Sequence, residues 1–172
     1  RAQPGTRYIY SSAVDVQGYL VEKLSEQPFA EFLKERIFEP LGMVDTAFYV
    51  PSSDVSRLAV LHSIDERGML QRLPAGKPFS ATPPGPSGGG GLFSTADDYL
   101  RFTQMLLNGG ELDGERLLAP RTVEMMRTNH MSAEATLNMR PGMGFGMDFM
   151  VYMDPAAAGE PHAPGAYYWL GI

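Results

Sequence analysis

Apolar residues recur at helical spacing in two neighbouring segments near the start of the chain. In residues 12–24 they form one face of a helix, and in residues 29–37 they form a similar stripe. Pro28 precedes the second stripe, where its missing N–H costs nothing. The stripes consist of Val14, Tyr19, Leu20, Val21 and Leu24, and of Phe29, Phe32, Leu33 and Ile37. The pattern therefore predicts two consecutive amphipathic helices, the second ended by residues 39–43.

Two further helices are indicated by their end signals. Ser94 or Thr95 can cap a helix, and the acidic Asp97 and Asp98 in its first turn suit the helix dipole. This helix is expected to run to Asn108 and to stop at the glycine pair 109–110. Pro120 is expected to open another helix through Arg127.

Strands are predicted between these helices and after them. Short strands are expected at 46–49 and 58–63, and a tight turn between short strands at 112–118. Alternating apolar positions predict one strand over 143–153, then a turn-rich connection over 154–164 and a further hairpin strand over 166–172. The proline- and glycine-rich stretch 83–91 is expected to be a loop.

Composition narrows the class of protein. The 172 residues are 44% hydrophobic and 20% charged, which is typical of one globular domain. No apolar run approaches the roughly 20 residues of a membrane span. The net charge of −6 without a basic block argues against nucleic-acid binding, and zero cysteines exclude disulfides and thiol chemistry. A cytoplasmic, periplasmic or secreted location is compatible with this composition, and the oligomeric state stays open.

Two further sequence features, a Gly-x-Ser-x-Gly match and the three histidines, do not indicate a catalytic or metal site. Residues 85–89 match Gly-x-Ser-x-Gly, but the nucleophile elbow requires a strand before the serine and a helix after it. Here proline and glycine surround Ser87, so a flexible loop near the cleft is expected. The histidines 62, 130 and 162 are scattered without a metal-binding spacing. We therefore expect neither a metal nor a cofactor.

Four blocks of the sequence, in this order and spacing, resemble the serine beta-lactamase-like family, and most closely its branch of class C beta-lactamases and family VIII carboxylesterases. The blocks are residues 4–12 (PGTRYIYSS), 37–46 (IFEPLGMVDT), 89–98 (GGGLFSTADD) and 169–171 (WLG). The resemblance implies an α/β (α+β) fold of the beta-lactamase/transpeptidase type, with an antiparallel sheet flanked by helices and a helical subdomain. Residues 1–172 would form part of one such catalytic domain.

The family's three motifs are Ser-x-x-Lys, Tyr-x-Asn, and Lys-Thr-Gly or its replacement. On that pattern Tyr10 is the motif tyrosine, Ser12 occupies the asparagine position, and Trp169 and Gly171 belong to the esterase branch's Trp-x-Gly. Ile172 would offer a backbone N–H to the oxyanion hole. No Ser or Thr in the chain precedes a Lys by three positions. We therefore expect the nucleophile segment before Arg1, unless the protein lacks it, and further strands after Ile172.

Tyr10 is the candidate general base. A free tyrosine has a pKa of about 10, and a nearby lysine ammonium favours the phenolate. The lysine of the missing motif would fill this role. The alternative is that Tyr10 is simply a tyrosine packed at the start of a helix.

Ser12 and Trp169 depart from the lactamase pattern. Serine is shorter than asparagine and has one donor, and it can equally serve as a helix N-cap. Trp169 replaces a lysine that would bind a substrate carboxylate, an interaction worth about 1.5–3 kcal/mol. Tryptophan offers apolar surface and one N–H instead. It could alternatively be a buried residue of a core strand.

These departures favour a serine hydrolase that cleaves small neutral carboxylic esters through an acyl-enzyme, without a cofactor. The alternative enzyme is a beta-lactamase or D,D-peptidase, acting on a beta-lactam-like substrate. A third possibility is a catalytically inactive relative that binds a ligand or partner in the same cleft.

Overall fold

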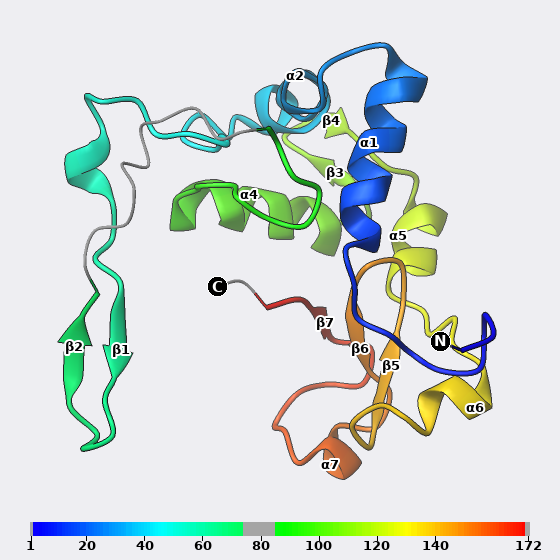
Figure 1. Ribbon diagram of the computed structural model, residues 1–172. Coiled ribbons are helices and arrows are strands. Elements are labelled where there is room, and N and C mark those ends of the chain that lie inside the picture. Colours follow the sequence, from blue (N-terminus) through cyan, green and yellow to red (C-terminus); the bar gives the residue numbers. More distant parts are fainter. Residues whose placement is uncertain (1, 74–84, 171–172) are drawn as a thin grey trace.

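A computed structural model of the chain describes residues 2–73 and 85–170. It shows the expected mixture of helices and small antiparallel sheets (Figure 1). Helix α1 (Ala13–Ser25), α4 (Ala96–Leu107) and α5 (Pro120–Met126) lie beside a three-stranded sheet of β5 (Met143–Phe145), β6 (Met150–Tyr152) and β7 (Tyr167–Tyr168). The predicted α/β class is confirmed.

The main core forms around α4, whose residues Met105 and Leu106 are buried. It also contains Phe38, Leu41, Met43 and Val123. The predicted start of α4 is confirmed: the Thr95 hydroxyl oxygen accepts a hydrogen bond from the Asp98 N–H at 3.2 Å. Its predicted end is confirmed as well, with Asn108 as C-cap and the following Gly109 at φ 73°.

The second predicted helix extends further than expected. Helix α2 (Phe29–Leu33) continues into a π-helical turn, η1 (Lys34–Phe38), and then into α3 (Glu39–Leu41). Pro40 lies in the first turn of α3, where no N–H is required of it. Gly42, at φ 63°, ends the helix inside the predicted segment 39–43.

The single strand predicted over residues 143–153 is wrong. It is a hairpin, in which β5 and β6 pair antiparallel with Gly144 opposite Val151. Asp148, at φ 61°, lies in the connection. A Cβ atom at Gly146 would lie 2.0 Å from the Met126 carbonyl oxygen, so only glycine fits at this position. The further strand predicted over residues 166–172 is confirmed in part. Strand β7 pairs with β6, but over only two residues.

The other short strands also differ from the sequence pattern. Residues 46–49 form only an isolated bridge between Ala47 and Phe93. The strand expected at 58–63 lies later, as β1 (His62–Ile64), and pairs with an unpredicted β2 (Leu70–Arg72). All residues of these two strands are exposed, and the hairpin projects from the body of the molecule (Figure 1).

The tight turn predicted at 112–118 is confirmed. Strands β3 (Glu111–Leu112) and β4 (Glu115–Arg116) pair across Asp113 and Gly114, both at positive φ. A 3-10 turn, η2 (Val55–Arg57), and two short helices, α6 (Ala133–Thr136) and α7 (Pro155–Ala158), fall in segments predicted to be irregular.

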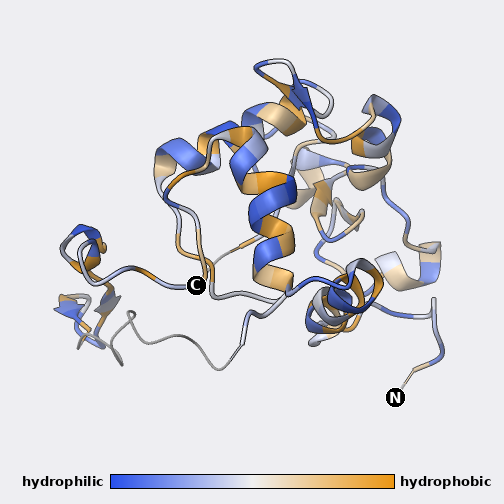
Figure 2. Cartoon of the chain, turned by 90° about the horizontal axis from the view of Figure 1, so that it is seen from above, coloured by the Kyte–Doolittle hydropathy of each residue, from blue (hydrophilic) through white to orange (hydrophobic). Residues whose placement is uncertain are grey.

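The apolar stripe of α1 remains largely open. Tyr19, Leu20 and Leu24 are between 49% and 85% exposed, and the one buried residue of the helix is Gly18. Figure 2 shows hydrophobic and hydrophilic residues alternating along the helices. Within the described ranges, none of the helices has the length and apolar character needed to cross a bilayer.

Candidate active site

Tyr10 and Trp169, from the first and last of the four sequence blocks, lie next to each other in the structure. The rings of Tyr10, just before α1, and Trp169, just after β7, have centroids 5.6 Å apart and a tilt of 35°. Both line one cavity of about 250 Å³. Tyr10 is 70% exposed and Trp169 is 39% exposed. Neither side chain is buried within the part of the chain that the structure describes.

The sequence pattern missed two further aromatic residues of this cavity. Phe145 meets Trp169 edge-on at 5.7 Å, and Tyr8 lies 5.0 Å from Phe145. Burial raises the pKa of Tyr8, and the neighbouring Tyr10 and Asp148 raise it further. We name the four rings Tyr8, Tyr10, Phe145 and Trp169 the aromatic cavity.

The glycine-rich loop forms another wall of the aromatic cavity through Gly88 and Gly89. Gly88 crosses α1 so closely that a Cβ atom there would lie 2.0 Å from the Val14 carbonyl oxygen. Asp15 of α1 holds the loop: its carboxylate accepts hydrogen bonds from the Ser87 hydroxyl and from the Gly89 N–H. The loop therefore lies beside the cavity that contains Tyr10 and Trp169.

Ser87 is not placed as a nucleophile elbow. It forms an isolated bridge with Gly90 across a turn, and the next helix begins only at Ala96. Its hydroxyl is committed to Asp15 rather than directed at the aromatic cavity.

Ser12 stands at the N-cap position of α1, but its side chain makes no capping hydrogen bond. The hydroxyl cap expected there is wrong, because its backbone is not in the extended conformation that directs a cap hydroxyl at the first turn. The Ser12 carbonyl accepts from the Asp15 N–H at 3.1 Å. Ser11, rather than Ser12, lines the aromatic cavity. Gly171 and Ile172 lie outside the described residues.

Asp148 is the charged residue of the aromatic cavity, and the sequence pattern did not single it out. Its carboxylate accepts a long hydrogen bond of 3.4 Å from the Gln17 side chain of α1. No lysine, arginine or histidine is among the described residues that line the cavity. The cavity thus combines four rings with one carboxylate.

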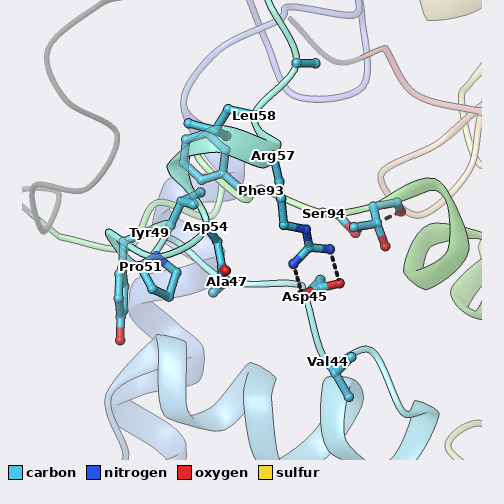
Figure 3. A pocket seen from close by; sticks show the side chains of 13 residues that line it. Val44, Asp45, Ala47, Tyr49, Pro51, Asp54, Arg57, Leu58, Phe93 and Ser94 are labelled. Carbon is cyan, nitrogen blue, oxygen red and sulfur yellow. Dashed lines mark hydrogen bonds and ion pairs between the residues drawn. The ribbon is translucent and has the colours of Figure 1, made fainter.

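A second cavity, of about 340 Å³, lies beside an ion pair (Figure 3). Arg57 donates to both carboxylate oxygens of Asp45, at 2.8 and 2.6 Å. These hydrogen bonds lower the pKa of Asp45 and raise that of Arg57. The buried Asp98 carboxylate accepts from the Asp45 N–H and the Thr46 hydroxyl, each at 2.8 Å. We name Asp45, Arg57 and Asp98 the polar joint.

The histidines take no part in either cavity. The ring of His162 lies 4.6 Å from that of Tyr152, and His130 contacts the Met125 carbonyl. His62 contacts the carbonyl of Val60 in the projecting hairpin. Among the described residues, no group of three acidic or histidine side chains is arranged to hold a metal ion.

Comparison with known proteins gives a consistent result. The beta-lactamase family model matches residues 1–172. An uncharacterized protein of Mycobacterium tuberculosis (strain CDC 1551 / Oshkosh) is 39% identical over 98% of this chain and 44% of its own length. Esterase EstB of Burkholderia gladioli is 33% identical over 98% of this chain and 45% of its own length.

Among solved structures, EstCE1, a hydrolase with promiscuous acyltransferase activity, has a TM-score of 0.75 and 29% identity. The match covers 95% of this chain and 45% of that protein. The chain thus spans about half the length of the proteins it matches.

Proposed function

This chain belongs to the beta-lactamase family, and on that premise we propose that the whole protein is a serine hydrolase for small carboxylic esters that carry no carboxylate. The reaction would proceed through an acyl-enzyme on the serine of a Ser-x-x-Lys motif. None of the 172 residues forms this motif, so the proposal requires that the whole protein supplies it elsewhere.

The observation that carries this proposal is the meeting of Tyr10 and Trp169 in one cavity. A beta-lactam or a peptidoglycan stem presents a carboxylate, which lysine at the Trp169 position would bind. Trp169 has no charge, and Asp148 in the same cavity repels an anion. An ester without a carboxylate fits both residues.

In the proposed reaction Tyr10 accepts the proton of the attacking serine hydroxyl, and the serine oxygen bonds to the ester carbonyl carbon. The motif lysine favours the phenolate form of Tyr10 as the base. The Ile172 backbone N–H would stabilise the developing oxyanion, and Tyr10 returns the proton to the ester oxygen as the C–O bond breaks and the alcohol leaves. In the second step water gives a proton to Tyr10 and attacks the acyl-enzyme carbonyl. Tyr10 then protonates the serine oxygen as the carboxylic acid leaves.

The relatives add support at the level of activity class. EstB is an esterase by name, and EstCE1 is described as a hydrolase. Both match nearly the whole of this chain, which supports an esterase among the activities of the family.

A matched pair of nitrophenyl esters tests the proposal in the whole protein. One ester carries a short alkyl acyl chain, and the other carries a chain of equal length ending in a carboxylate. We expect the alkyl ester to be preferred in kcat/KM by roughly 10-fold or more, because a substrate carboxylate has no cationic partner among the described lining residues and an unpaired polar group costs about 1–3 kcal/mol.

Nitrocefin, a beta-lactam substrate, tests the alternative activity in the same assay. Turnover of nitrocefin alone would replace the esterase by a beta-lactamase. Turnover of neither substrate, in protein that contains the Ser-x-x-Lys motif, would support an inactive ligand-binding relative.

A further inference from the structure

The aromatic cavity has a chemistry that hydrolysis itself does not require. Four rings surround it, and its charged lining residue is Asp148. The ring faces of Tyr10 and Trp169 are accessible, because these side chains are 70% and 39% exposed. Repulsion of anionic substrates explains why a carboxylate is tolerated here, but an uncharged ester would make no favourable charge interaction with it.

Aromatic faces attract cations through the ring quadrupole, and such contacts contribute about 0.5–2 kcal/mol. A carboxylate beside the rings adds a Coulombic attraction for the same cation. Rings elsewhere in the chain already pair with the protein's own cations: Lys23 lies over Tyr19, and Arg36 lies over Phe32. No such cation lies over the rings of the aromatic cavity within the described residues.

The backbone and Gln17 fix the position of the carboxylate. Asp148 has a left-handed φ of 61° in the turn between β5 and β6. Among the described residues its side chain accepts one hydrogen bond, from Gln17, which is long at 3.4 Å, so the carboxylate retains capacity for a further partner. A net charge of −6 also favours the approach of a cation over that of an anion.

We propose that the aromatic cavity binds a quaternary or protonated amine, so that the preferred esters carry an ammonium group close to the ester bond. The rings would contact the N-methyl or N–H face of the cation, and Asp148 would neutralise its charge. The cavity volume of about 250 Å³ suits a small head group, since pockets for drug-sized ligands usually measure about 300–1,000 Å³. This inference rests on the proposed esterase function.

Two isosteric thioesters separate charge from shape. Acetylthiocholine carries a trimethylammonium group, and 3,3-dimethylbutyl thioacetate carries a tert-butyl group of the same shape. In the whole protein we expect kcat/KM to favour the cationic ester by roughly 3- to 30-fold, which corresponds to the usual range of cation–π attraction.

The variant Asp148→Asn keeps the shape of the side chain and removes its charge. It should lower kcat/KM for acetylthiocholine by a larger factor than kcat/KM for the neutral thioester. Asp97→Asn, at an exposed position in the first turn of α4, is the matched control and should change neither. Equal turnover of the two thioesters would overturn the proposal, and so would an equal loss for both in Asp148→Asn.

A binding measurement keeps this test independent of turnover. Trp169 is the one tryptophan of the 172 residues, so its fluorescence reports directly on the cavity. Titration with tetramethylammonium should change the fluorescence of Trp169, and titration with the neutral analogue tert-butanol should not. The variant Trp169→Phe lacks this fluorescence and serves as the blank. If no ester is turned over but the signal responds, the esterase proposal fails and the amine site stands. If esters are turned over without charge preference and the signal is unchanged, the amine site fails alone.

Discussion

The aromatic cavity and the cavity beside the polar joint differ in whether their charged groups already have partners. In the polar joint, both carboxylate oxygens of Asp45 accept hydrogen bonds from Arg57. The Asp98 carboxylate accepts two more, from the Asp45 N–H and the Thr46 hydroxyl. In the aromatic cavity, Asp148 has one long hydrogen bond, and the rings of Tyr10 and Trp169 are accessible.

This difference indicates that the polar joint has a structural role and that the aromatic cavity can bind a ligand. Charged groups that already bind each other join chain segments and have little capacity left for a ligand. Ring faces and a carboxylate that remain open can still bind a substrate. The larger of the two cavities is therefore the weaker candidate for the active site, in spite of its volume.

The largest expected effect falls on Tyr10. Tyr10→Phe in the whole protein should reduce ester turnover by about 10²–10⁴-fold, the usual contribution of a general base. Tyr49→Phe removes the same hydroxyl at the edge of the other cavity and should leave turnover within twofold. Steady-state kinetics with a short nitrophenyl ester measure both. Equal effects of the two variants would remove Tyr10 from the mechanism.

The second prediction concerns the buried carboxylate of the polar joint. Asp98→Ala leaves the Asp45 N–H and the Thr46 hydroxyl without their acceptor, which should cost about 2–4 kcal/mol in the free energy of unfolding. Asp97→Ala, at an exposed position in the same helical turn, should cost less than about 0.5 kcal/mol. Urea unfolding gives both values. An unchanged stability of Asp98→Ala would mean that Asp98 does not join the segments.

The third prediction uses the contact between the glycine loop and α1. In Gly88→Ala the new methyl group would overlap the Val14 carbonyl, so the loop must move away from the helix. We expect a loss of about 1–3 kcal/mol in stability, together with a lower kcat/KM. Gly90→Ala is the control, because nothing lies within 4 Å of its added Cβ. Thermal unfolding and ester kinetics should separate the two variants.

The smallest effect is a pH dependence of the polar joint. The hydrogen bonds from Arg57 lower the pKa of folded Asp45, so the carboxylate stabilises the protein above the unfolded carboxyl pKa of about 3.9. This contribution is lost as the pH falls through the lower, folded value. Asp45→Asn should therefore be less stable than the wild type at pH 7, and the difference should shrink at pH 3. A difference independent of pH would contradict the assignment.

Local signals account for the parts of the fold that the sequence predicted well. Thr95, followed by two acids, caps α4 as expected, and the Asp113–Gly114 pair makes the expected tight turn. Tyr10 and Trp169 were also identified from the sequence, through the family motifs. Such features depend on neighbours in the chain or on a motif that spans few residues.

The parts that were missed depend on distant segments. The alternation of residues 143–153 predicts one strand, but Gly146 must pass close to the Met126 carbonyl, and the Met147 N–H bonds to that same oxygen at 2.9 Å. The resulting turn is what places Asp148 in the aromatic cavity. In the same way, the acid pattern assigned Asp98 to a helix dipole, and only the fold shows that it binds Asp45 and Thr46.

The glycine loop also limits where this chain tolerates a change of length. Residues 87–93 are fastened at one end to Asp15 and at the other to Ala47 through the Ala47–Phe93 bridge. An inserted residue between these two anchors would break one of them. The exposed tip of the β1–β2 hairpin, at residues 65–69, has no such tether to the body, so a peptide tag or a reporter domain is best inserted there.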